Sequence, residues 1–229
     1  MIVANHAQTK QLESLTSLPL KFRRELKSED PVVFAGIYQE QTNIAIWRRS
    51  LTEQLKSDVN RFLDSNPTFQ TSTVVTKENA FLLISKHLND DSQLQLAKNI
   101  SHLVEIFCDL FEIEQAGLRL TSLDRAMCPK FHVDKLPCRL ITTFQSVATE
   151  WLPHESVDRS KLGLGSNGKP DNESGIFTNP KDIQRLTAGD VALLKGELWE
   201  DNENAGLVHR SPVVPEGQRR LVLTLDFVQ

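Results

Sequence analysis

The pattern of hydrophobic and polar positions changes along the chain, from helical spacing in the first half to short strand-like stretches in the second. After a capping-box sequence at residues 50–53, apolar residues recur every three or four positions, which is typical of an amphipathic helix. The apolar stripe of such a helix needs a sheet or another helix to cover it, so this half predicts a helical layer. We expect helices over residues 51–64, 77–88 and about 92–110, and strands over residues 31–37 and 43–47.

From Leu118 onward the pattern predicts strands separated by turn residues. Six such strands would form most of an eight-stranded jelly roll. We therefore expect an α+β protein, with a double-stranded β-helix core of the jelly-roll or cupin type and an N-terminal helical layer. The expected strands cover residues 118–121, 130–134, 138–145, 190–195, 206–210 and 220–227.

The chain is expected to form one domain, over residues 31–229, behind a polar lead-in at residues 1–30. Within this domain, residues 31–117 would supply strands and packing helices, and residues 118–229 the β core. Residues 155–181 are rich in Gly, Pro, Asn, Asp and Ser and hold little apolar material. Loops of this length are usually lids, binding loops or insertions, so the segment is either a flap over a site or an insertion without a role.

Composition narrows the classes of protein and partner. Hydrophobic residues make up 39% of the chain and charged residues 24%, as in ordinary globular proteins. No apolar run approaches the roughly 20 residues of a membrane helix, and the start lacks a signal peptide, so we expect a cytoplasmic protein without a membrane partner. The net charge of −4 comes without a basic stripe, which argues against a nucleic-acid partner. A small molecule or a protein remains as the unidentified substrate.

The strongest candidate for chemistry is the pair His132 and Asp134, together with His209 further along the chain. Side chains at positions i and i+2 of a strand point the same way, so His132 and Asp134 are expected on one face. A second imidazole beside them would complete the two-histidine, one-carboxylate set of mononuclear non-haem iron. The same three ligands also suit zinc.

An oxygenase that uses 2-oxoglutarate must bind the distal carboxylate of this co-substrate. A guanidinium does so with two parallel hydrogen bonds, so an arginine near the metal ligands is expected. Arg220 begins the last expected strand and would share its inner face with Val222 and Thr224 if the alternating leucines pack on helices. If the leucines face inward instead, Arg219 is the better candidate.

Three further residues have roles that the sequence leaves open. Cys128 and Cys138 flank the His132 and Asp134 pair and are either structural, redox-sensitive or auxiliary ligands. Glu150 is a reserve ligand, because a glutamate often completes the metal site of a cupin. The odd number of cysteines and the lack of a Cys-x-x-Cys pair argue against a disulfide framework.

At this point the residues resemble known families. The stretches 189–195, 209–212 and 220–223 resemble the C-terminal half of the phytanoyl-type iron and 2-oxoglutarate dioxygenases. The stretches 128–134, 149–152 and 206–212 resemble, more closely, a bacterial family known as domain of unknown function 1826. The dioxygenase resemblance implies a double-stranded β-helix with His132, Asp134 and His209 on the metal and Arg220 on a co-substrate. The second resemblance implies a link to metal homeostasis.

Two functions follow from these observations, and a third reading is structural. The first is an iron(II)- and 2-oxoglutarate-dependent oxygenase acting on an unidentified substrate. The second is a non-catalytic cytosolic protein that binds zinc or a related metal. In the third, the chain is a β-sandwich interaction domain in which the spacing of His132 and Asp134 is a coincidence.

Overall fold

The structure of the protein is a computed structural model that describes residues 22–88 and 94–228. Residues 1–21 of the lead-in expected at residues 1–30, and the expected helix start near Ser92, lie outside this part of the chain. The strands are β1 (Arg24–Ser28), β2 (Thr42–Trp47), β3 (Gln70–Thr76), β4 (Gln115–Leu123), β5 (Cys138–Gln145), β6 (Glu150–Leu152), β7 (Gln184–Arg185), β8 (Val191–Lys195), β9 (Val208–Arg210) and β10 (Arg220–Phe227). The helices are η1 (Pro31–Tyr38), α1 (Glu53–Ser65), α2 (Ala80–Leu88), α3 (Leu94–Phe111), η3 (His154–Ser156), η4 (Arg159–Lys161), η5 (Gly163–Ser166), α4 (Asp171–Ser174) and η6 (Pro180–Asp182).

The strands form a large and a small sheet. The large sheet has the order β1-β2-β8-β5-β10-β4-β3, and the small sheet has the order β7-β6-β9. Strands β1 and β2 are parallel, and the other described pairs of neighbouring strands are antiparallel. The jelly-roll core behind an N-terminal helical layer, expected from the sequence, is confirmed.

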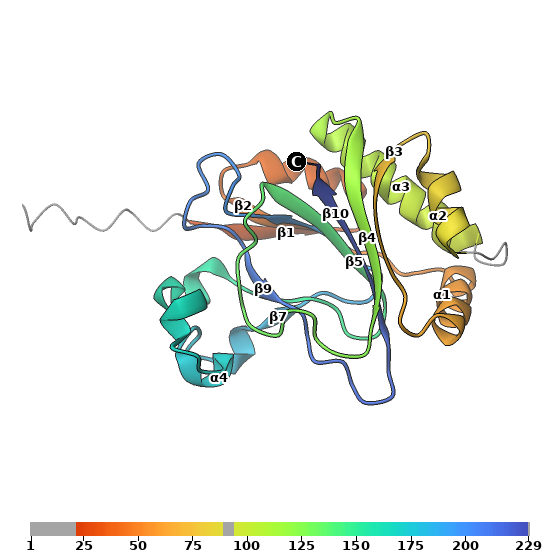
Figure 1. Ribbon diagram of the computed structural model, residues 1–229. Coiled ribbons are helices and arrows are strands. Elements are labelled where there is room, and N and C mark those ends of the chain that lie inside the picture. Colours follow the sequence, from red (N-terminus) through yellow and green to blue (C-terminus); the bar gives the residue numbers. More distant parts are fainter. Residues whose placement is uncertain (1–21, 89–93, 229) are drawn as a thin grey trace, which may run out of the picture.

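One face of the large sheet is covered by α1, α2, α3 and η1, which lie together on one side of it in Figure 1. The alternation along β10 shows how the sheet divides its two faces. Leu221, Leu223 and Leu225 are buried in the core under the helices, whereas Val222 and Thr224 face the opposite side. Because successive side chains of a strand alternate, Arg220 faces the same side as Val222 and Thr224.

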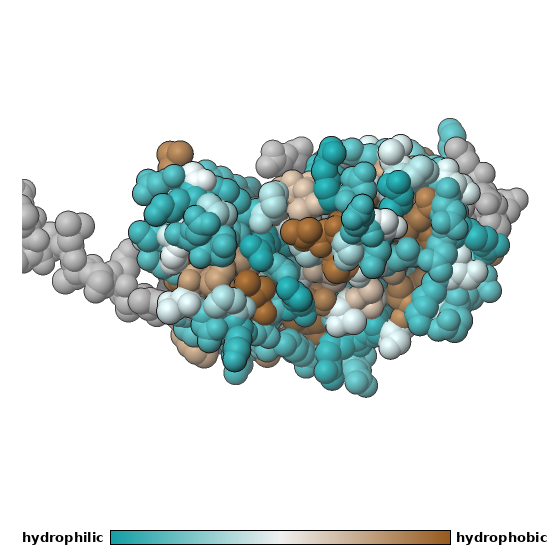
Figure 2. All heavy atoms as spheres, turned by 90° about the horizontal axis from the view of Figure 1, so that it is seen from below, coloured by the Kyte–Doolittle hydropathy of each residue, from teal (hydrophilic) through white to brown (hydrophobic). Residues whose placement is uncertain are grey.

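The second core lies between the two sheets. Ile46 and Ile141 of the large sheet are buried together with Trp151 of the small sheet and with Leu207 beside it. This apolar layer fills one part of the space between the sheets and leaves the part next to β4 and β10 for a pocket. The underside of the molecule is mostly hydrophilic, with apolar residues gathered in a hollow in the middle of that face (Figure 2).

The N-terminal strands differ from the expectation in three places. Residues 31–37, expected to be a strand, form the 3-10 helix η1, because Pro31 opens it and the Asp30 carboxylate accepts the backbone N–H of Val32 at 2.9 Å. A short apolar run does not by its periodicity distinguish a strand from a buried helical turn. Strand β1 lies inside the expected polar lead-in, and β3 was not predicted.

The stretch 130–134, also expected to be a strand, is irregular and keeps a single bridge, between His132 and His209. In the described part of the chain, no helix is both long enough and apolar enough to cross a membrane.

Candidate metal centre

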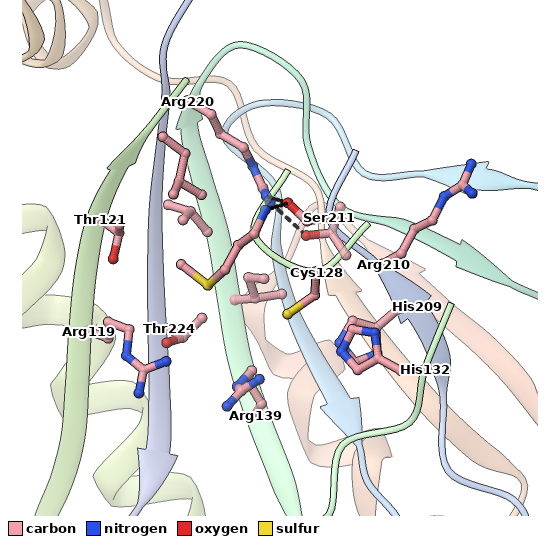
Figure 3. Close-up of a pocket in the computed structure, with 15 residues that line it drawn as sticks. Arg119, Thr121, Cys128, His132, Arg139, His209, Arg210, Ser211, Arg220 and Thr224 are labelled. Carbon is pink, nitrogen blue, oxygen red and sulfur yellow. Dashed lines mark hydrogen bonds between the residues drawn. The ribbon is translucent and has the colours of Figure 1, made fainter. Parts of the chain in front are cut away.

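Two histidines from distant parts of the chain are held side by side by their own backbones. The N–H of His132 donates to the carbonyl of His209 at 3.0 Å, and the N–H of His209 donates to the carbonyl of His132 at 3.0 Å. Residues that exchange both hydrogen bonds in an antiparallel bridge carry their side chains on the same face. The ring centroids are accordingly 4.6 Å apart (Figure 3).

Asp134 joins this pair. Its Oδ1 lies 3.6 Å from Nε2 of His132, and its Oδ2 lies 3.5 Å from Nε2 of His209. Donor atoms bound at right angles to one ion at about 2.0–2.2 Å lie about 3 Å apart, so each of these two contacts is about half an ångström longer than in a metal site. Among the described residues, these three form the group with metal-ligand spacing, and the structure thus brings the predicted set together.

The second ring nitrogen of each histidine faces a backbone carbonyl. Nδ1 of His132 lies 2.9 Å from the carbonyl oxygen of Lys130, and Nδ1 of His209 lies 3.2 Å from that of Leu207. A carbonyl only accepts, so each Nδ1 carries a proton, and Nε2 keeps its lone pair free when the ring is neutral. This is the tautomer that a metal-binding imidazole needs.

The charges of the three groups also suit a cation. Burial lowers the pKa of His209 to about 4, so its imidazole is neutral at neutral pH. Burial opposes ionisation of Asp134, but the hydrogen bond to His132 and the nearby positive groups hold the pKa of its carboxyl well below the usual range. Burial opposes protonation of His132, yet its hydrogen bonds to Asp134 and Lys130 raise its pKa above the usual value.

Arg139 binds the carboxylate of Asp134 and is itself bound by Asp226. The Arg139 guanidinium donates to Oδ2 of Asp134 at 2.6 Å and binds Asp226 with two hydrogen bonds of 2.7 and 2.9 Å. Oδ1 of Asp134 remains for a metal. Neither residue is predicted from the sequence, because their contact depends on β5 and β10 being neighbours and no local spacing indicates it.

A pocket of about 80 Å³ lies beside the two histidines, between β4, β5 and β10. This volume has room for several water molecules or one small organic acid. Its wall includes Arg220, whose guanidinium donates to three hydroxyls: Thr143 at 3.0 Å, Thr149 at 2.9 Å and Ser211 at 2.9 Å. Figure 3 shows this guanidinium at the opposite end of the pocket from Arg139.

Arg220 is a buried cation that has no acidic partner among the described residues. Only 2% of the residue is exposed, and burial lowers the pKa of its guanidinium to about 10. A buried charge normally has an opposite charge beside it, so the end of the pocket at Arg220 is suited to bind an anion. Arg219, the alternative candidate, is half-buried and donates to the carbonyl of Pro67 at 2.7 Å, outside this pocket.

The three residues with open roles lie differently. Cys128 lines the pocket but lies outside the ligand group, and Cys138 is buried in β5, where burial raises the pKa of its thiol. Both carboxylate oxygens of Glu150 are bound by arginines, Arg185 at 2.7 Å and Arg210 at 2.7 Å. Glu150 is therefore structural here and lies outside the ligand group.

None of the described residues that line this pocket belongs to the segment 155–181, and its role as a flap stays a prediction. The segment packs against the outer side of the site, where Ile176 shares an apolar cluster with Phe131 and Val208. Asp171, on α4, accepts the backbone N–H of Phe131 at 2.9 Å. The segment thus braces the stretch that carries His132.

Comparison with solved structures identifies the class of fold. A rice dioxygenase for auxin oxidation (DAO) is similar to this chain with a TM-score of 0.50 and 8% sequence identity, over 90% of this chain and 83% of that one. Two further similar structures are dioxygenase for auxin oxidation 1 of Arabidopsis thaliana in a complex with 2-oxoglutarate (TM-score 0.47, 10% identity, 90% and 92% covered) and an oxidoreductase of the 2OG-Fe(II) oxygenase family of Burkholderia pseudomallei (TM-score 0.43, 11% identity, 89% and 94% covered). At such low identity the likeness to the rice protein establishes a shared fold.

The sequence then places the chain in a family. The profile described as protein of unknown function (DUF1826) matches residues 28–226, and the chain belongs to this family. The resemblance to that family, drawn from the sequence, is confirmed. No protein with a curated description matches the sequence. The resemblance to phytanoyl-type enzymes in particular stays a prediction.

Proposed function

We propose that this protein is a non-haem iron(II)- and 2-oxoglutarate-dependent oxygenase. The observation that carries the proposal is the buried, acid-free guanidinium of Arg220 in the same pocket as the His132, Asp134 and His209 group. A metal store needs the three ligands but has no use for an unpaired buried cation beside them. A 2-oxoglutarate-dependent oxygenase needs both.

The donor set fits iron(II). Two imidazole nitrogens and one carboxylate oxygen would hold the ion as the facial set of such sites, which leaves further positions for a co-substrate and oxygen. The neutral His209 and the ionised Asp134 are in the protonation states that bind a divalent cation. His132 has a raised pKa, so a protonated His132 would have to release a proton before it binds the metal.

Arg220 would hold the far carboxylate of 2-oxoglutarate. Its guanidinium is already oriented by Thr143, Thr149 and Ser211, so little side-chain entropy is lost when an anion binds. The three hydroxyls can also donate to the incoming carboxylate, since each hydroxyl has a hydrogen to give as well as lone pairs.

The chain's contribution to the reaction is positioning and exclusion of water. Bound iron(II) supplies the activation of O2, by which 2-oxoglutarate, O2 and a substrate C–H bond become succinate, CO2 and a hydroxylated product. The bridge between His132 and His209 fixes the two imidazoles, and Arg139 fixes the carboxylate of Asp134. The apolar wall of Ile141 and Val222 keeps the pocket partly dry, which strengthens the polar contacts inside it.

An anaerobic titration tests the proposal. The full chain, loaded with iron(II), is mixed with 2-oxoglutarate under nitrogen, and the visible charge-transfer band of the complex is recorded. Air is then admitted and succinate is measured. We expect a band that requires both iron and 2-oxoglutarate, followed by slow succinate formation even without a substrate. A protein that binds zinc tightly and gives neither band nor succinate would contradict the proposal and favour the metal-binding alternative.

A further inference from the structure

One wall of the pocket carries polar groups that neither the metal site nor the Arg220 end uses. Arg119 and Thr121 lie on the inner face of β4, and Thr224 lies opposite Arg119 on β10. Within residues 22–88 and 94–228, Arg119 has no hydrogen-bond or ion-pair partner. The hydroxyls of Thr121 and Thr224 are buried and also have none among these residues.

For the two threonine hydroxyls, which are buried, this lack of partners is unusual. Thr121 is only 3% exposed, and a buried hydroxyl without a partner destabilises the fold. By contrast, the hydroxyls of Thr149 and Ser211, which also line the pocket, and that of Thr143 all accept hydrogen bonds from Arg220. Arg119 beside them is exposed, so the missing ligand is indicated by the two unpaired buried hydroxyls, and the guanidinium is free to bind it.

The ligand at this wall differs from the one at Arg220. Thr224 is four residues after Arg220 on β10, which is roughly 13 Å along a strand. Figure 3 shows Arg119 and Thr224 together on the side of the pocket across from His132 and His209. Arg139, the nearest other cation in the view, is already bound to Asp134 and Asp226. A molecule held at Arg119 thus extends toward the metal group from the opposite side.

The pocket is open at this wall. Strand β3 forms the edge of the large sheet, and its Gln70 and Ser72 pair with Thr121 and Arg119. Both β3 residues are exposed, so the three-stranded sheet does not cover this edge. A substrate can therefore reach Arg119 across a polar strand without passing the Arg220 end.

We propose that Arg119, with the hydroxyls of Thr121 and Thr224, forms a subsite for an oxyanion carried by the substrate, a carboxylate or a phosphate. That the bound molecule is a substrate rests on the proposed oxygenase function. The presence of an anion subsite does not depend on that function. A guanidinium flanked by two hydroxyl donors is suited to an oxyanion, because all three donate hydrogen bonds to it. The subsite orients the substrate so that its uncharged part lies next to the metal group.

Calorimetry with simple probes tests the subsite. The full chain is saturated with iron(II) and 2-oxoglutarate under nitrogen, which occupies Arg220, and is then titrated with benzoate, phenyl phosphate and the neutral benzamide. We expect one of the two anions, but not benzamide, to bind. Arg119→Gln should weaken that binding about tenfold, since it removes a charge-assisted contact. Arg24→Gln, an exposed arginine on the opposite edge strand β1, is the matched control and should change nothing.

The outcomes separate this proposal from the proposed function. Anion binding that is equal in the wild type and Arg119→Gln, or no anion binding at all, overturns the subsite. The charge-transfer band reports independently on iron and 2-oxoglutarate. If the band is absent while binding that depends on Arg119 persists, the oxygenase function fails and the anion subsite stands.

A second variant guards against misfolding. Thr121→Val keeps the shape of the side chain and removes the unpaired hydroxyl. We expect it to raise the urea midpoint of the ligand-free protein and to weaken binding of the anionic probe about threefold, by the loss of one neutral hydrogen bond. A lower urea midpoint with unchanged probe binding would assign the hydroxyl a purely structural role and contradict the proposal.

Discussion

His132 and His209 donate their backbone N–H groups to each other's carbonyl oxygens, both at 3.0 Å. This reciprocal pair makes the relative position of the two imidazoles a property of the backbone. A slip of one residue would turn one of the rings to the other face, so the site depends on this register. The apolar cluster behind it, with Phe131 and Val208, holds the register in place.

The three candidate ligands should be individually required for metal binding. We expect His132→Ala, Asp134→Ala and His209→Ala each to weaken iron(II) binding by more than about 100-fold, because outer-shell changes alone cost 10- to 100-fold. Metal content after dialysis and succinate formation measure the effect. His102→Ala, an exposed histidine on α3, is the control and should behave like the wild type. Stoichiometric iron in Asp134→Ala would rule out the proposed ligand set.

Neighbouring arginines should differ sharply in their effect on 2-oxoglutarate. Arg220→Gln should leave iron binding intact and raise the dissociation constant for 2-oxoglutarate about 100-fold, since two charge-assisted hydrogen bonds are lost. Arg219→Gln should have no effect, because Arg219 lies outside the pocket and bonds only to the carbonyl of Pro67 in the described contacts. Titration of the visible band with 2-oxoglutarate compares the two variants, and equal dissociation constants would show that the anchor lies elsewhere.

Asp226 should control the charge beside the metal site. Asp226→Asn removes the countercharge of Arg139 and leaves a net positive group 2.6 Å from Asp134, so we expect metal affinity to fall about tenfold. Adding Arg139→Gln to that variant restores the local charge and should recover part of the affinity. Competition with a metal chelator measures both. A double variant that binds metal no better than Asp226→Asn would refute the electrostatic explanation.

The stability of the protein should fall in mild acid because of His154. Burial lowers the pKa of His154 to about 4, and its Nδ1 lies 3.2 Å from the Arg159 guanidinium, which can only donate. The unfolded histidine, with an ordinary pKa of 6.5, binds protons first. The contribution to stability is therefore complete above pH 6.5 and is lost as the pH falls toward 4, by at most about 3 kcal/mol.

Urea unfolding between pH 7 and pH 4 checks this expectation. His154→Gln keeps a polar side chain without a titrating group, so its free energy of unfolding should decline less over this range than that of the wild type. An identical decline in both proteins would mean that His154 titrates normally in the folded state.

Much of the architecture could be predicted because it depends on local periodicity. The helical spacing of Leu55, Val59 and Phe62 corresponds to the buried face of α1, and the leucine alternation of β10 indicates which face packs on the helices. The errors fall where periodicity is uninformative. The run 31–37 is apolar throughout and adopts the capped helix η1, and β1 is a short edge strand of mixed polarity.

By itself, the sequence determined which residue types were available for chemistry and that His132 and Asp134 were close enough along the chain to act together. The tertiary structure decided the rest: the bridge that adds His209, the neighbouring strands that join Arg139 and Asp226 to Asp134, and the position of residues 155–181 behind the site. The physical reason is that strand order and register are set by the burial of whole sheet faces. Contacts across a sheet therefore join residues that no local pattern connects.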